Sequence, residues 1–169
     1  MSAADATRLG AGDWADWRER LLAALAGLTD GGSLTLTAPD AAVRPARLRR
    51  PRLRGLVPGR YEDVAPWVRL RRSEHHLRGF CIGSDVVGGT FPLSRQEHDA
   101  LLGLGWRAPA PLEGHDYTHW WPDDVPLAPF LPEDEARRAV LMVEETFRTV
   151  LAAPSEDDRS PGLPTVTTG

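Results

Sequence analysis

Hydrophobic residues recur at helical spacing in three stretches of the chain. The first predicted helix follows Asp13, an expected N-cap, and ends before Asp30, with one apolar face made of Trp14, Trp17, Leu21, Leu25 and Leu28. The last covers residues 133–152 after Pro132, and its apolar face is Ala136, Val140, Val143, Phe147, Val150 and Leu151. The middle one is shorter and carries its own start and stop signals.

That middle stretch, residues 93–106, predicts a capped helix with a tryptophan anchor. Ser94 and Glu97 have the spacing of a capping box, in which each side chain accepts a hydrogen bond from the other residue's backbone amide. Gly105 stands where a helix commonly ends in a left-handed residue. The structural motif comprises Ser94, Glu97, Leu101, Leu104, Gly105 and Trp106.

Alternating apolar and polar positions predict strands at 33–38, 67–72, 77–84 and 117–121. A turn at 73–76 would join the second and third strands as an antiparallel hairpin, with Phe80 and Ile82 sharing one face of the latter. The element order α-β-β-β-α-β-α, with one more short strand left open, indicates an α+β fold. We expect an antiparallel sheet of about five strands packed with three helices.

The composition suggests one domain at residues 12–153, preceded by a flexible N-terminus at 1–11. A segment rich in arginine and proline, about 41–61, interrupts it and reads as a loop with a short edge strand near 52–56. Residues 154–169 contain few apolar residues, so we expect a disordered tail there.

Several functional classes find little support. Cys81 is the only cysteine, which excludes an internal disulfide and favours a cytoplasmic location. The chain contains no run of about 18 apolar residues, so we expect no membrane span. The histidines near acids (His75, His76, His115 and His119) do not share a rigid element suited to a metal. With no nucleophile or phosphate-loop motif either, we expect no catalytic residues, no cofactor and no enzyme activity.

The segment between Ala41 and Tyr61 contains seven arginines and no acid, in a chain whose net charge is −4. Three interpretations remain open: a solvated loop, contact with an acidic peptide or partner, or a nucleic-acid site. No aromatic residue is interleaved among these arginines to stack bases, so nucleic acid is the less favoured partner. The basic segment comprises Arg44, Arg47, Arg49, Arg50, Arg52 and Arg54.

The chain contains six tryptophans, a high count for 169 residues. Trp120 and Trp121 are adjacent in an extended segment, so at least one could be exposed, although both could also line a minor core. Exposed aromatic residues beside a sheet are typical of a peptide-binding groove. The candidate partner-binding residues are Trp67, Arg69, Arg71, Tyr117, Trp120 and Trp121.

The pattern L-S-x-x-E-x-x-x-L-x-x-L-G-W-x-x-P, at residues 93–109, resembles the N-terminal module of actinobacterial TY-Chap proteins. This family is named for type III secretion chaperones and YbjN-like peptide-binding chaperones. The aromatic stretch at 116–121 and the closing helix with its Thr146-Phe147-Arg148-Thr149-Val150 ending are similar too. The resemblance covers about residues 12–152, and the segment at 41–61 looks like an insertion relative to the family.

The resemblance implies a secretion-chaperone-like α+β sandwich that binds a peptide or a partner segment without catalysis. It supplies no catalytic residues to carry over. We therefore expect a cytoplasmic, non-enzymatic peptide- or protein-binding module, with a homodimer left open. Two alternatives are kept: a nucleic-acid-associated regulator acting through Arg44 to Arg60, and an immunity or secretion-accessory protein dedicated to one partner.

Overall fold

The computed structural model describes residues 13–47, 61–110, 114–123, 130–152 and 162–169. Its main sheet is antiparallel and five-stranded, in the order β6-β5-β4-β1-β7. The strands are β1 (Ser33–Thr37), β4 (Trp67–Ser73), β5 (His76–Cys81), β6 (Tyr117–Trp121) and β7 (Thr165–Thr168). The α+β class, the five-stranded sheet and the β4–β5 hairpin are confirmed.

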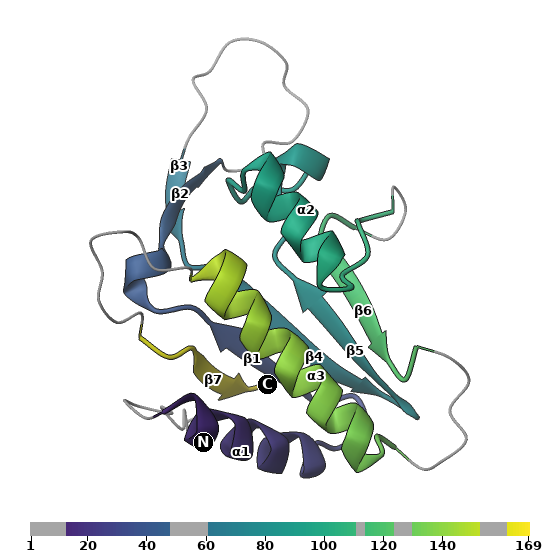
Figure 1. Cartoon of the computed structure of the whole chain (residues 1–169). Helices are drawn as coiled ribbons and strands as arrows, with labels where there is room; N and C mark the ends of the chain where they lie inside the picture. Colours follow the sequence, from purple (N-terminus) through teal and green to yellow (C-terminus); the bar gives the residue numbers. More distant parts are fainter. Residues whose placement is uncertain (1–12, 48–60, 111–113, 124–129, 153–161) are drawn as a thin grey trace, which may run out of the picture.

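Three helices cover one face of this sheet (Figure 1). They are α1 (Trp14–Ala26), α2 (Arg95–Gly103) and α3 (Glu133–Thr146), which continues as a π-helical turn, η3 (Phe147–Leu151). The core lies between the layers, where Leu34 and Leu36 of β1 and Val68 and Leu70 of β4 are at most 1% exposed. Because every second strand residue points toward the helices, the remaining strand residues form a second face.

The capped helix agrees with its sequence signals. Ser94 Oγ accepts from the Glu97 amide at 3.2 Å, and Glu97 Oε2 accepts from the Ser94 amide at 2.7 Å, so both halves of the capping box are present. Gly105 has a φ of 104°, and Trp106 behind it is 2% exposed. The Trp106 indole N–H donates to Thr146 Oγ1 at 2.8 Å, which fastens the end of α2 to α3.

The interpretation of 41–61 as loop is wrong at both ends of the segment. A 3-10 turn, η1 (Asp40–Ala42), leads into β2 (Arg44–Arg47), and β2 pairs with β3 (Tyr61–Val64) as a separate two-stranded ribbon. Pro45 is tolerated because each strand of the ribbon has only one neighbour. The edge strand expected near 52–56 lies outside the described residues.

The expectation of a disordered tail is wrong for residues 162–169. Thr165–Thr168 form β7, which pairs antiparallel with β1 and places Val166 opposite Leu36. A short strand needs only backbone pairing and one inward side chain, so low apolar content did not exclude it. Residues 153–161 and the N-terminal residues 1–12 are outside the described part, so the proposed domain limits there stay a prediction.

Candidate functional site

The sheet face opposite the helices, here called the open face, brings several candidate residues together. The strand register places Arg69 between Thr35 of β1 and Phe80 of β5, and it places Arg71 opposite Arg78. Arg78 in turn lies opposite Trp120 of β6. The outward positions across the sheet are Ser33, Thr35, Thr37, Trp67, Arg69, Arg71, Ser73, His76, Arg78, Phe80, Thr118, Trp120, Thr165 and Thr167.

Arginine and aromatic side chains are stacked on one another across this face. The Arg78 guanidinium lies 4.6 Å from the centre of the Phe80 ring and 4.7 Å from that of Trp120. The Arg69 guanidinium lies 5.3 Å from the Trp67 ring centre. Such cation–π contacts hold the rings in place at the surface without burying them fully. Trp67, Phe80 and Trp120 accordingly remain half-buried.

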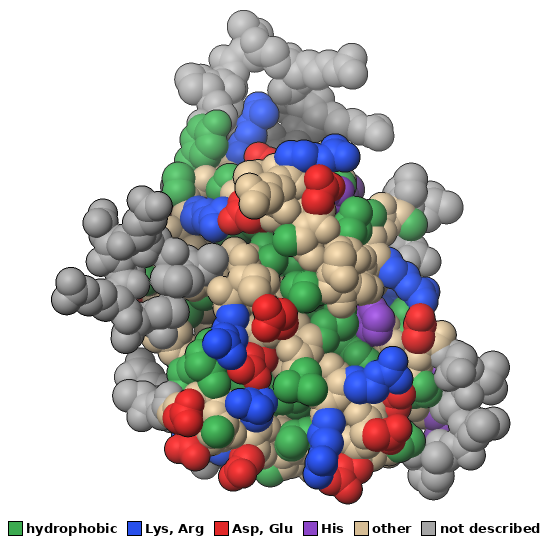
Figure 2. Space-filling model, viewed as in Figure 1, with side chains coloured by type: hydrophobic (Ala, Val, Ile, Leu, Met, Phe, Trp, Pro, Cys, Tyr) green, Lys and Arg blue, Asp and Glu red, His purple; other side chains and the backbone are tan. Residues whose placement is uncertain are grey.

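The charge of the open face is of one sign. Its outward strand positions hold three arginines and no aspartate or glutamate. Arg69, Arg71 and Arg78 form no salt bridge with any residue that the structure describes. In contrast, acidic and basic side chains alternate over the helical side (Figure 2). An anionic group approaching the open face would therefore meet uncompensated positive charge.

One acid, Asp116, stands directly before β6, and its carboxyl interacts electrostatically with Arg69. Its Oδ1 accepts a hydrogen bond from the Gly83 amide at 3.0 Å. Burial raises the pKa of the Asp116 carboxyl, and the Gly83 amide and the Arg69 charge only partly oppose the rise. The carboxylate is thus committed to the Gly83 loop, and the direct partner that the structure shows for Arg69 is neutral: its Nε donates to Thr35 Oγ1 at 3.3 Å.

Two predicted partner-binding residues, Tyr117 and Trp121, do not reach the open face. Tyr117 is fully buried on the helical side, where its hydroxyl lies 2.6 Å from His98 Nδ1. Trp121 is 3% exposed and packs against Trp106 with ring centres 6.2 Å apart. Successive strand residues point to opposite faces, so Trp120 can face outward only if Tyr117 and Trp121 face the core.

Arg78 and Phe80 were not predicted as site residues, although the sequence contains the signal. The sequence analysis placed Phe80 and Ile82 on one face of this strand without choosing its core side, and the residues of β5 that face the helices are Leu77, Gly79 and Cys81. Gly79 leaves room for aromatic rings, because a Cβ there would lie 2.7 Å from the Trp121 ring. Alternation starting from Leu77 would have placed Arg78 and Phe80 outward.

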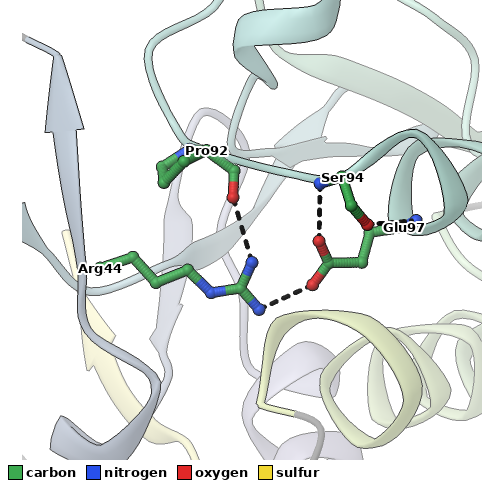
Figure 3. A network of polar contacts seen from close by, with 4 residues as sticks. All are labelled: Arg44, Pro92, Ser94 and Glu97. Atoms are coloured by element: carbon green, nitrogen blue, oxygen red, sulfur yellow. Dashed lines mark hydrogen bonds and ion pairs between the residues drawn. The ribbon is translucent and has the colours of Figure 1, made fainter.

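The basic segment is divided by the structure. Arg44 belongs to β2 and contacts the α2 N-terminus (Figure 3): its guanidinium donates to Pro92 O at 3.1 Å and to Glu97 Oε1 at 2.7 Å. Arg44 is therefore occupied in holding the ribbon against the capping box. Arg47 is exposed, whereas Arg49, Arg50, Arg52 and Arg54 lie outside the described residues. The nucleic-acid alternative through this segment stays a prediction.

On the helical side, a cleft of about 340 Å³ lies where α3 passes β6. Trp120 is among the residues that line it. Leu141, which is 53% exposed, gives it an apolar margin. The other lining residues are Leu104, His119, Trp121, Asp123, Glu135, Arg138 and Met142.

The described residues offer no geometry for a metal site, a reactive thiol or a membrane span. They contain no group of three or more histidine, cysteine, aspartate or glutamate side chains placed to hold a metal ion. Burial raises the pKa of the Cys81 thiol well above its usual range, so the thiol stays protonated. None of the helices in the described ranges is long and apolar enough to cross a membrane.

Comparison with known proteins assigns the chain to a family. Residues 7–158 match the family described as "T3SS (YopN, CesT) and YbjN peptide-binding chaperone 3", TY-Chap3. This match spans most of the 169 residues, including the capped helix and four strands of the main sheet. No curated protein and no solved structure matches. The chain, with its α+β sandwich and its open arginine–aromatic face, belongs to the TY-Chap3 family of peptide-binding chaperone domains.

Proposed function

We propose that this protein binds a peptide or partner segment across the open face of its sheet. The observation that carries the proposal is the convergence of Trp67, Arg69, Arg71 and Trp120, together with Arg78 and Phe80, on the face that no described helix covers. Aromatic rings held by guanidinium groups offer apolar contact area at little cost in side-chain entropy, because they are already ordered.

The chemistry of the face favours an acidic, extended partner. Three arginines without salt-bridge partners among the described residues would attract carboxylates. Arginine also binds a carboxylate through two parallel N–H groups, which gives orientation as well as attraction. Aliphatic or aromatic side chains of the partner would pack on Trp67, Phe80 and Trp120.

The proposed activity is non-enzymatic, and the protein would act by holding its partner. The buried, protonated Cys81 supports this assignment, because it removes the one thiol as a nucleophile. A lone reduced cysteine also suits the cytoplasm, which is the compartment that we propose. A dedicated partner in immunity or secretion would be one form of the same activity.

Selection of peptides from a random library on the immobilised protein tests the proposal. We expect the selected sequences to be enriched in aspartate and glutamate, and we expect Trp67→Ala and Trp120→Ala each to weaken their binding about tenfold. Leu141→Ala on the helical side is the control, because Leu141 is an exposed apolar residue that does not lie on the open face. Equal affinities for all four proteins would refute binding at the open face.

A further inference from the structure

β7 is attached to β1 largely through the backbone. Ser33 and Gly169 exchange both backbone hydrogen bonds, at 3.2 and 3.0 Å, and the register continues through Thr35↔Thr167 to Thr37↔Thr165. Backbone pairing of this kind is nearly independent of sequence, and extended peptides use it when they add to the edge of a sheet. The edge of β1 would accept another strand by the same bonds.

The buried indole of Trp17 on α1 also forms a hydrogen bond with the backbone just before β7. The Trp17 indole N–H donates to the carbonyl of Pro164 at 3.1 Å, and Trp17 is fully buried. A buried N–H without an acceptor is costly, so whatever lies on β1 has to present a carbonyl at this point. Trp17 therefore fixes the main chain of this segment at Pro164, which is itself buried, while Leu163 before it packs against the core.

Few side chains hold β7 in place. Of its four residues only Val166 is buried, at 7% exposure, whereas Thr165, Thr167 and Thr168 are exposed. The inner strand β4, in comparison, buries Val68 and Leu70 completely. The family match moreover ends at residue 158, before β7, so the matched part contributes β6-β5-β4-β1 with β1 at its edge.

We propose that the edge of β1, together with Trp17, is a binding site for an extended peptide, and that residues 163–168 occupy it as an internal ligand that an external segment replaces. We expect an external ligand to carry an uncharged side chain at the position of Val166, which points inward. It carries a small β-branched residue two positions after the residue whose carbonyl meets Trp17, as Val166 follows Pro164. This site is at the sheet edge and is separate from the arginine–aromatic open face, so each can fail without the other.

Because residues 163–168 belong to the same chain as β1, an external peptide has to compete with them at their high effective concentration. A segment tethered by a short linker acts at an effective concentration of the order of millimolar. The unmodified chain is therefore expected to bind an external peptide weakly. Weakening β7 should reveal the affinity of the vacated edge.

The test uses the full chain and the capped octapeptide acetyl-GLPTVTTG-amide, labelled for fluorescence anisotropy. Val166→Asp places a charge at the inward position of β7, and we expect the variant to bind the octapeptide at least tenfold more tightly than the unmodified chain does. The control peptide GLPTDTTG should bind neither protein. A Val166→Asp chain with an unchanged near-UV circular dichroism spectrum and no gain in affinity would overturn the proposal.

If Val166→Asp loses the native spectrum, Val166→Ala replaces it under the same criterion. Hydrogen exchange on the unmodified chain is the second measurement. We expect the amides of Thr165 and Thr167 to exchange at least tenfold faster than that of Leu70, because β7 leaves the sheet without global unfolding. Equal rates for these amides, set by global unfolding, would overturn the proposal as well.

Discussion

The guanidinium of Arg78 lies 4.7 Å from the centre of the Trp120 ring, on the face of the sheet opposite the helices. The centre of the Phe80 ring lies 4.6 Å from the same guanidinium. Moreover, Arg78 Nε is buried without a hydrogen-bond acceptor in the described part of the chain. The Arg78 guanidinium thus packs against two surface rings and forms no salt bridge with any residue in the described ranges.

This relationship predicts an energetic coupling between Arg78 and Trp120. In a double-mutant cycle with Arg78→Met and Trp120→Leu, we expect a coupling free energy of about 0.5–1 kcal/mol, because a cation–π contact at the surface has that strength. Methionine keeps the apolar stem of the side chain, so the cycle isolates the charge. Urea unfolding of the four proteins measures the coupling, and additive single effects would contradict the contact.

The bond between Trp106 and Thr146 is expected to hold α2 on α3. Thr146→Val keeps the shape of the side chain but leaves the buried indole N–H without its acceptor. Because an unsatisfied buried donor costs about 1–3 kcal/mol, the free energy of unfolding should fall by that amount. Thr149→Val is the control, since Thr149 is exposed and its hydroxyl donates to the Glu145 carbonyl of the preceding helical turn. Equal losses for the two variants would contradict a special role of Trp106.

Gly79 is expected to tolerate no side chain. A Cβ at this position would lie 2.7 Å from Cζ3 of Trp121 and 3.2 Å from Cη2 of Trp106. Gly79→Ala should therefore lower the free energy of unfolding by about 1–3 kcal/mol through overpacking. Gly103→Ala in α2 meets nothing within 4 Å and should be neutral or stabilising by up to about 1 kcal/mol. Thermal unfolding that ranks the two variants the other way would contradict this packing.

The ion pair between Arg44 and Glu97 is expected to make stability depend on pH. Partial burial alone would raise the pKa of the Glu97 carboxyl, but the hydrogen bonds from Arg44 and from the Ser94 amide outweigh burial and lower the pKa below its ordinary value. A carboxyl with a lowered folded-state pKa stabilises the fold above its unfolded-state pKa, about 4.3, and loses that stabilisation as pH falls through the folded-state value.

Glu97→Gln preserves the capping geometry and removes only the charge. The unmodified protein should therefore exceed this variant in stability by up to about 1 kcal/mol at pH 7. The difference should shrink as pH falls below about 4 and vanish near pH 2. Chemical denaturation at several pH values measures it. A difference that is the same at pH 7 and pH 2 would mean that the charge contributes nothing.

Much of the fold could be predicted from local signals. The capping box, the left-handed Gly105 and the period of the three helices are all properties of neighbouring residues, and the structure confirms them. β7 and the β2–β3 ribbon could not be predicted in the same way. Their strands are short and polar, and partners distant in the sequence stabilise them: β1 lies 132 residues before β7 at the Thr35–Thr167 pair.

In the candidate site, too, some features follow from local sequence and others depend on distant packing partners. Strand alternation placed Trp67, Arg69 and Arg71 correctly on one face of β4. Which face of β6 would point outward was not fixed by its own sequence, since Tyr117, Trp120 and Trp121 are all aromatic. The choice depends on His98 and Trp106, which lie on the helical side and contact Tyr117 and Trp121. Only the packed helices, therefore, separate the core rings from the surface ring.

The central claim, binding of an acidic segment at the open face, is tested most directly by a charge-matched pair of variants. Arg69→Glu/Arg71→Glu reverses two charges on the open face, whereas Arg95→Glu/Arg137→Glu reverses two exposed charges on the helical side. Both changes alter the net charge equally. The measurement is the affinity, by fluorescence anisotropy at about 0.1 M salt, for one acidic peptide selected on the unmodified protein. We predict a loss of at least tenfold for the open-face pair and little change for the helical pair, and equal losses for both would contradict the account.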